Sequence, residues 1–132
     1  MKMWGFAMAM FFLTPGGDVT GEHTKDTLKT VQENLKAGKA ILLDVREKEE
    51  WKQGHLKDAR LVPLSEIKAN AEAASKKLPK QLIIYTHCKA GQRSMYAAEF
   101  LKKYELDVRA LRAGYEELLE AGFSKDESQP DQ

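Results

Sequence analysis

Four short apolar segments recur along the chain, and each is followed by a polar, glycine or proline break. They cover residues 40–45, 60–62, 82–87 and 107–111. The segment 40–45 is nearly continuously apolar, which is typical of a strand that is buried on both faces of a sheet, and the other three are interpreted as strands as well. Between these runs, apolar residues recur at helical spacing. Strands that alternate with helices predict an α/β fold, with a central, mostly parallel sheet of about four or five strands and helices on both faces.

The helices are predicted from the same pattern. The first covers residues 27–37, and Gly38 suits its carboxyl end. A longer helix begins at Ser65 and ends before Pro79, with one apolar face. That face consists of Ile67, Ala71, Ala74 and Leu78. Shorter helices are expected at 47–51, 95–103 and 115–121.

The two ends of the chain are expected to lie outside this domain. Lys2 precedes an apolar run, residues 3–13, about as long as the core of a secretory signal, roughly 7–15 residues. We therefore interpret residues 1–20 as a signal-peptide-like segment. The alternative is a disordered or core-packed terminus. The domain itself is predicted to span 21–123, and the polar residues 124–132 to form a disordered tail.

Composition narrows the class of protein. The chain has 132 residues, and its 21 basic and 20 acidic residues give a net charge of +1. That balance argues against a nucleic-acid partner, and we expect no membrane association in the mature form. One cysteine excludes an intramolecular disulfide and a paired-cysteine redox motif, and the three histidines are dispersed. We expect no metal site, no cofactor and a monomer.

The candidate chemistry is concentrated at the end of the third predicted strand. This strand ends at Cys88, and a short loop leads directly into a helix. The loop amides and the helix N-terminus would meet at the sulfur and favour the thiolate over the thiol. Lys89 and Arg93 add positive charge beside it. The alternative is that Cys88 is only a small buried apolar side chain. The segment 44–46 also follows a strand, and ligands bind at the carboxyl ends of parallel strands.

The loop length indicates which group the loop would bind. Four residues separate Cys88 from Arg93, whereas phosphotyrosine-type phosphatases need five between their cysteine and arginine. Ser94 stands where the phosphatase arginine would be. A tighter ring of N–H donors suits one extra atom on the cysteine, such as the outer sulfur of a persulfide.

Three segments, in this order, are similar to the patterns of single-domain rhodaneses, a family of sulfurtransferases. The first is Leu43-Asp44-Val45-Arg46, followed by Glu50-Trp51, Gly54-His55-Leu56, Ala59 and Val62-Pro63. The second is Cys88-Lys89-Ala90-Gly91-Gln92-Arg93-Ser94, and the third is Val108-Arg109-Ala110-Leu111 with Gly114-Tyr115 and Leu118. The resemblance covers about residues 27–123. Asp58, Leu61 and Ala113 depart from the family pattern, at turns rather than at the nucleophile.

This resemblance implies a rhodanese-like three-layer sandwich in which Cys88 carries the persulfide. It implies that the residues after the cysteine form a cradle for the sulfur and for an anionic substrate. These residues are Lys89, Ala90, Gly91, Gln92, Arg93 and Ser94. Asp44 and Arg46 would support the neighbouring loops, with Glu50 as a further partner of this charge pair.

Other side chains near these motifs have simpler interpretations. Ser94 would either donate a hydrogen bond to the sulfur or cap the helix. We expect His87 to be a hydrogen-bonded residue at the strand end rather than a proton shuttle. His55 is expected to fix a turn, and Trp51 to belong to the core.

The function predicted from the sequence is sulfur transfer through Cys88. The donor would be thiosulfate or a similar compound, and the acceptor cyanide or a thiol. The alternative is a protein-interaction or persulfide-relay module that exchanges sulfur with a partner protein. A phosphatase or arsenate reductase is disfavoured by the loop length. We expect export, for example to a periplasm, or otherwise a cytoplasmic location.

Overall fold

The computed structural model describes residues 21–128, and the predicted signal-like segment lies outside this range. Within it, four strands form one sheet in the order β2-β1-β3-β4. The strands are β1 (Ala40–Asp44), β2 (Ala59–Leu61), β3 (Ile83–His87) and β4 (Asp107–Ala110). Every neighbouring pair is parallel. The predicted α/β fold is confirmed.

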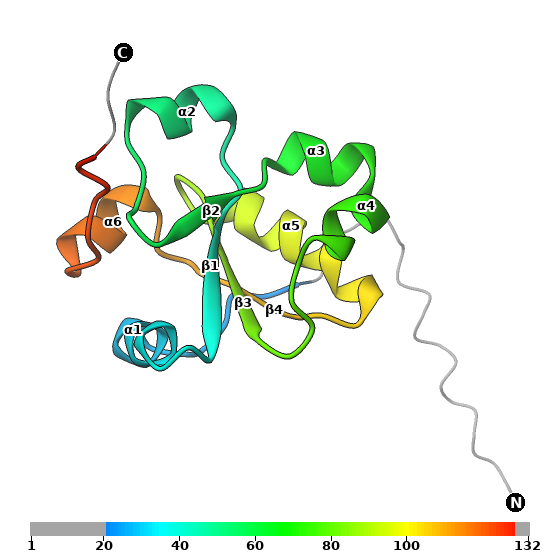
Figure 1. The fold of residues 1–132 in the computed structure, drawn as a ribbon, viewed down its shortest axis with the longest axis horizontal. Helices are drawn as coiled ribbons and strands as arrows, with labels where there is room; N and C mark the ends of the chain where they lie inside the picture. Colours follow the sequence, from blue (N-terminus) through cyan, green and yellow to red (C-terminus); the bar gives the residue numbers. More distant parts are fainter. Residues whose placement is uncertain (1–20, 129–132) are drawn as a thin grey trace, which may run out of the picture.

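Helices cover both faces of this sheet (Figure 1). On one face lie α3 (Leu64–Ala69), α4 (Ala71–Lys76) and α5 (Gln92–Leu101), and α5 continues into a short 3₁₀ turn, η2 (Lys102–Tyr104). On the other lie α1 (Leu28–Lys36) and α6 (Tyr115–Glu120). The remaining helix, α2 (Lys48–Gln53), follows β1 beyond the carboxyl edge of the sheet.

Successive strand residues face opposite layers, as the pleat of a strand requires. Leu43 and Ile84 join the core beneath α3, α4 and α5. Leu42 and Tyr85 join the core beneath α1 and α6. All four are buried, and each buried leucine or isoleucine contributes roughly 1.5–3 kcal/mol. This two-sided burial is the reason why the central strands β1 and β3 are apolar over most of their length.

The single long helix predicted from Ser65 is wrong, because the structure breaks it into α3 and α4. The break is at Asn70, whose φ and ψ of −160° and 84° are not helical. The Asn70 side chain accepts a hydrogen bond from the Ala73 N–H at 3.0 Å and so caps α4. Asparagine favours such a cap over a helix interior. The two helices still bury Ile67 and Ala74, as the predicted apolar face required.

The carboxyl-terminal segment is more ordered than the sequence predicted. The Lys57 N–H donates to the Ser124 carbonyl at 2.8 Å, and Lys125 forms an isolated antiparallel bridge with Leu56. The Asp126 N–H donates to the His55 carbonyl at 2.9 Å. Backbone pairing therefore orders residues 124–126, and the expected disorder does not apply to them. Residues 129–132 lie outside the described range.

No helix between residues 21 and 128 combines the length and the apolar character that a membrane crossing needs.

Candidate active site

The candidate site lies at the carboxyl edge of the two central strands. Asp44, the last residue of β1, is directly paired with His87, the last residue of β3. Cys88 follows immediately, so the topology brings together the two groups that the sequence placed at strand ends. β1 and β3 are adjacent although they are not consecutive, and parallel sheets commonly bind ligands at such a point.

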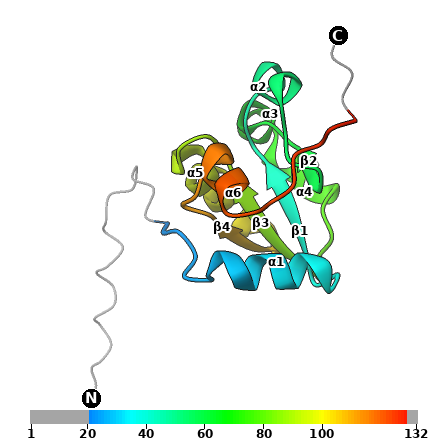
Figure 2. The same cartoon turned by 90° about the vertical axis from the view of Figure 1, so that its left-hand side faces the viewer.

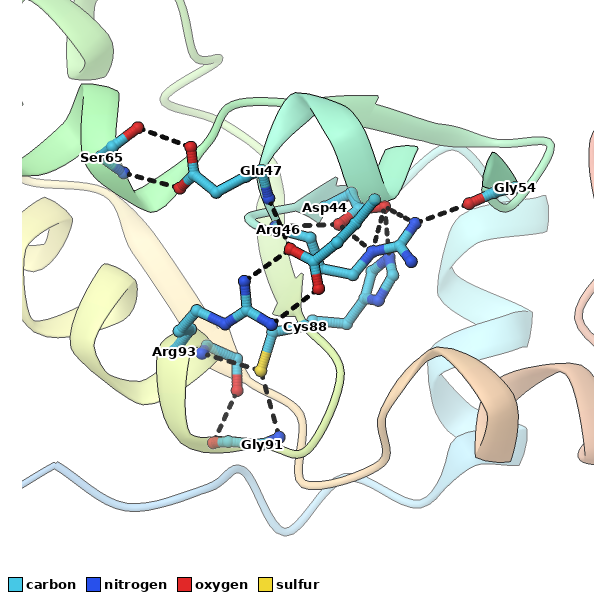
Figure 3. Close-up of polar contacts among 11 residues, drawn as sticks. Asp44, Arg46, Glu47, Gly54, Ser65, Cys88, Gly91 and Arg93 are labelled. Atoms are coloured by element: carbon cyan, nitrogen blue, oxygen red, sulfur yellow. Dashed lines mark hydrogen bonds and ion pairs between the residues drawn. The ribbon is translucent and has the colours of Figure 1, made fainter. Parts of the chain in front are cut away.

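Backbone N–H groups surround the Cys88 sulfur. The Gly91 N–H donates to Sγ at 3.1 Å and the Ser94 N–H at 3.3 Å (Figure 3). Ser94 lies in the first turn of α5, where backbone N–H groups have no partner within the helix. Cys88 is only 1% exposed. Amide donors at a helix N-terminus, shielded from bulk water, stabilise negative charge on this sulfur.

Gly91 is required at its position for two reasons. Its φ of 93° lies in the left-handed region, which side chains with a Cβ rarely adopt. A Cβ would also lie 2.8 Å from the Arg112 carbonyl oxygen. The loop therefore turns sharply here, and this turn aims the Gly91 N–H at the sulfur.

The Ser94 hydroxyl takes neither of the two roles predicted for it. It donates to the carbonyl oxygens of Gly91 and Leu111, both at 2.9 Å, and so fastens the loop to the end of β4. The hydrogen bond to the sulfur comes from the Ser94 backbone N–H instead. The hydroxyl thus supports the backbone of the loop and does not itself bond the sulfur.

Arg93 is held by an acidic residue from α2. Its guanidinium donates to both carboxylate oxygens of Glu50, at 2.8 and 3.0 Å (Figure 3). This bidentate pair lowers the pKa of Glu50 to about 2 and raises that of Arg93. Glu50 also accepts the Glu47 N–H at 2.9 Å, which closes the first turn of α2. The expectation that Glu50 partners the Asp44–Arg46 pair is wrong, since its carboxylate pairs with Arg93 in the loop after Cys88.

Asp44 and Arg46 form a buried ion pair beneath the site. Arg46 Nε lies 2.9 and 3.1 Å from the two carboxylate oxygens, and Nη2 donates to one of them at 2.8 Å. Nη2 also donates to the Gly54 carbonyl at 2.8 Å, and the guanidinium lies 4.4 Å from the centre of the Tyr115 ring. One arginine thereby links the end of β1, the end of α2 and the start of α6.

His87 differs from its prediction. It is fully buried, and neither ring nitrogen has a hydrogen-bond partner among residues 21–128. Nε2 lies 3.7 Å from an Asp44 oxygen. Burial lowers the pKa of His87 to about 4, although the Asp44 charge acts in the opposite direction. The imidazole is therefore neutral at neutral pH.

The other predicted site side chains lie at the surface. Lys89, Ala90 and Gln92 are exposed. Lys89 borders a small cavity of about 200 Å³. Its other lining residues are Arg46, Glu50, Gln53, Gly54, Tyr115 and Glu116. The side chains of Ala90 and Gln92 add little to the site, and the loop contributes through its backbone. No cluster of residues suited to a metal ion occurs in the part of the chain that the structure describes.

Two nearby side chains also differ from or refine the sequence interpretation. Trp51 is only partly buried and stacks on His55, with ring centres 3.5 Å apart. His55 bonds the Trp51 carbonyl at 3.0 Å and the Asp126 carboxylate at 2.9 Å. His23, which the sequence did not single out, reaches the catalytic loop: its Nε2 lies 2.7 Å from the Gly91 carbonyl oxygen. No motif signals a contact between residues so far apart.

Comparison with known proteins places this site in a family. The family model described as "Rhodanese-like domain" matches residues 27–121. Two relatives come from Bacillus subtilis. The uncharacterized protein YqhL is 38% identical over 79 residues, covering 58% of this chain and 60% of YqhL. The putative sulfur carrier protein YrkF is 30% identical over 97 residues, covering 70% of this chain and 50% of YrkF. The chain thus spans less than two thirds of the length of these curated relatives.

Solved structures agree with this assignment. A rhodanese-related protein from Thermoplasma volcanium superimposes with a TM-score of 0.63 and 28% identity, over 74% of this chain and 92% of that protein. The human single-domain sulfurtransferase TSTD1 gives a TM-score of 0.57 and 26% identity, over 70% of this chain and 92% of TSTD1.

Proposed function

We propose that this chain, which belongs to the rhodanese family, is a sulfurtransferase that carries a sulfane sulfur as a persulfide on Cys88. The proposal rests above all on the two backbone N–H groups, from Gly91 and Ser94, that donate to the Cys88 sulfur. Fixed donors of this kind stabilise negative charge without having to reorganise during the reaction. Relatives named as a sulfurtransferase and as a putative sulfur carrier support the same chemistry.

The loading step takes sulfur from thiosulfate or a similar anionic donor. The Cys88 thiolate attacks the outer sulfur of thiosulfate and forms a new S–S bond. The S–S bond of thiosulfate breaks, and sulfite leaves with its electron pair. The extra sulfur on Cys88 then carries the negative charge. No proton is transferred, so the step needs no general base, and the buried, neutral His87 is not required to act as one.

The unloading step returns the enzyme to its starting state. Cyanide or a thiolate attacks the outer sulfur of the persulfide, and the bond between that sulfur and Cys88 breaks. Thiocyanate or a new persulfide leaves, and the Cys88 thiolate is regenerated. The cycle consumes no oxidant or reductant, because each step exchanges one nucleophile for another at sulfur.

Lys89 is the side chain best placed to attract the anionic donor. It is exposed, borders the cavity beside the loop, and has no carboxylate partner within residues 21–128. Arg93 lies in the first turn of α5, but its positive charge is already neutralised by the Glu50 carboxylate. An anionic donor would therefore meet Lys89 first and compete with Glu50 for Arg93.

Intact mass spectrometry tests this function directly. Purified protein is incubated with thiosulfate, desalted, and then treated with cyanide. We expect a gain of one sulfur atom that cyanide removes, with thiocyanate released. The variant Cys88→Ala should fold, because alanine fits the space of the cysteine, but should gain no sulfur. An unchanged mass of the wild type, with Cys88 shown to be free and reactive, would contradict the thiosulfate proposal.

A second candidate is a relay that accepts sulfur only from a partner protein. The burial of Cys88 favours it, because a 1% exposed sulfur admits a donor only when the loop opens. The similarity to a protein named a putative sulfur carrier also favours it. A cysteine desulfurase loaded with sulfane sulfur serves as the test donor. Loading of Cys88 by that protein, but not by thiosulfate, would select the relay.

A further inference from the structure

His23 precedes the part of the chain that the family shares. It lies in the segment 21–26, which we call the leading segment, whereas the family match begins at residue 27. Its Nε2 lies 2.7 Å from the carbonyl oxygen of Gly91, in the middle of the sulfur-binding loop. This is a contact between a side chain from one end of the domain and the backbone that surrounds the nucleophile.

The leading segment is held firmly along the outer strand of the sheet. The Thr24 N–H donates to the Ala110 carbonyl, at the end of β4, at 2.7 Å. The Asp26 carboxylate accepts from the Tyr85 hydroxyl at 2.6 Å and from Arg109 at 2.9 Å. Figure 2 shows this segment in blue, where it runs past the sheet into α1. The backbone bond of Thr24, next to His23, thus holds this part of the segment at the end of β4, and Asp26 attaches the rest of the segment to β3 and β4.

The Gly91 carbonyl accepts two hydrogen bonds, one from His23 and one from the Ser94 hydroxyl. The peptide bond that follows Gly91 is trans, so its carbonyl and the Gln92 N–H point in opposite directions. Fixing the carbonyl toward His23 therefore fixes the Gln92 N–H on the other side. Gln92 is the first residue of α5, and its N–H has no partner within the helix.

We infer that His23 is a positioning residue that orients the Gly91–Gln92 peptide, so that the loop amides face the sulfur carried by Cys88. This inference rests on the proposed function and deepens it. The Gly91 and Ser94 N–H groups contact Sγ itself. The Gln92 N–H remains available for the outer sulfur or for the donor. His23 donates through a protonated Nε2, which the neutral imidazole and the imidazolium both provide.

Three variants separate this role from a merely structural one. His23→Leu removes the donor, and His23→Gln retains an N–H at a similar distance. Asp26→Asn weakens the bonds to Tyr85 and Arg109, but it leaves the Thr24 backbone bond beside His23 intact and does not touch the loop. The first measurement is the single-turnover rate at which the full-length protein gains sulfur from thiosulfate. Intact mass spectrometry at successive times monitors this gain.

We expect His23→Leu to slow sulfur loading about five- to tenfold, the effect of losing one oriented hydrogen bond. His23→Gln should recover to within about twofold of the wild type, and Asp26→Asn should load at the wild-type rate despite a lower melting temperature. A wild-type rate for His23→Leu would overturn the inference. So would an equal slowing by Asp26→Asn, because the effect would then come from loosening the whole segment.

Amide hydrogen exchange by NMR keeps the test independent of the donor. His23→Leu should speed exchange at Gly91, Gln92 and Ser94 more than at the amides of β3, whereas Asp26→Asn should not show this local effect. If the wild type takes no sulfur from thiosulfate, the thiosulfate proposal fails, and the exchange data still decide the role of His23. Unchanged exchange in the loop of His23→Leu would overturn that role.

Discussion

His87 precedes Cys88 in the sequence, but no hydrogen bond between residues 21 and 128 joins its ring to the Cys88 sulfur. The ring is fully buried, and its Nε2 lies 3.7 Å from the Asp44 carboxylate. Asp44 is already satisfied by Arg46. The site therefore keeps a neutral imidazole next to the loop that follows Cys88, and this arrangement makes the folded state sensitive to acid.

We predict a pH-dependent loss of stability from His87. Its pKa is about 4 in the folded state, against the ordinary histidine value of 6.5 expected in the unfolded chain. As the pH falls below 6.5, the His87 imidazole binds a proton in the unfolded chain, whereas the buried imidazole of the folded protein stays neutral until about pH 4. The free energy of unfolding should fall by roughly 3 kcal/mol between pH 6.5 and 4 from this group, at about 1.36 kcal/mol per pKa unit.

Urea unfolding at pH 7.5 and pH 4.5 checks this prediction. The variant His87→Leu should lose less stability than the wild type over this interval, because it cannot bind the proton in either state. The same pH dependence in both proteins would assign the acid sensitivity to other groups. Glu50 does not confuse the result, since its pair with Arg93 is lost only as the pH falls from 4.5 toward 2.

The Glu50 carboxylate competes with an anionic substrate for the Arg93 guanidinium. We predict that Glu50→Gln lowers the thiosulfate concentration that gives half-maximal sulfur loading, by about two- to fivefold, because Arg93 loses its bidentate carboxylate. The measurement is the loading rate against thiosulfate concentration.

Glu49→Gln is the matched control, because Glu49 is exposed, carries the same charge and lies next to Glu50 in α2. An equal effect of both variants would attribute the change to net charge alone. An unchanged or higher half-saturating concentration for Glu50→Gln would show that Arg93 does not bind the donor.

At the scale of elements, the break between α3 and α4 has a testable cause. We predict that Asn70→Ala lowers the free energy of unfolding by about 1 kcal/mol, because the Ala73 N–H loses its cap. Asn70→Asp should retain the cap and most of the stability. Urea unfolding measures both. An Asn70→Ala variant as stable as the wild type would indicate that α3 and α4 can join into one helix.

The elements that the sequence predicted well are those with a local signal. The segments 40–45 and 82–87 each contain at least four consecutive apolar residues, and both became central strands. The strand-to-helix turn at Cys88 was equally visible, since Gly91 allows the turn and α5 follows. Asn70 was missed because helical spacing of apolar residues fits two short helices as well as one long helix.

The missed parts of the site depend on contacts between residues far apart in the sequence. Glu50 and Arg93 are 43 residues apart, and His23 and Gly91 are 68 residues apart. No sequence motif marks either pair, because each contact depends on how the fold brings a charged group or a ring nitrogen close to its partner. The ordered tail is similar: Asp126 reaches His55 through backbone pairing that its polar sequence does not indicate.

At the scale of the whole molecule, the parallel sheet gathers the chemistry at one edge while two cores support it from below. Both cores are built from residues between Val31 and Phe123. The leading segment adds to this domain from outside the family match and contacts the catalytic loop. If the chain is shortened from its amino end, its stability and sulfur loading should therefore depend on whether residues 21–26 are retained, and not on how many residues are removed.

We predict that a chain starting at residue 21 unfolds within about 2 °C of the full chain and loads sulfur at the same rate, because it retains both cores, His23 and Asp26. A chain starting at residue 27 loses the Asp26 bonds to Tyr85 and Arg109 as well as the His23 contact. It should unfold at a temperature several degrees lower, since 1 kcal/mol corresponds to roughly 3–6 °C at this size.

Differential scanning calorimetry and intact mass after thiosulfate compare the three chains. A large loss of stability on removing residues 1–20 would show that this segment belongs to the core and is not a separable leader. Equal stability and loading for the chain that starts at residue 27 would show that the family domain is sufficient without the leading segment. The expected order, with a loss only between the starts at 21 and 27, would make residues 21–26 part of the working domain.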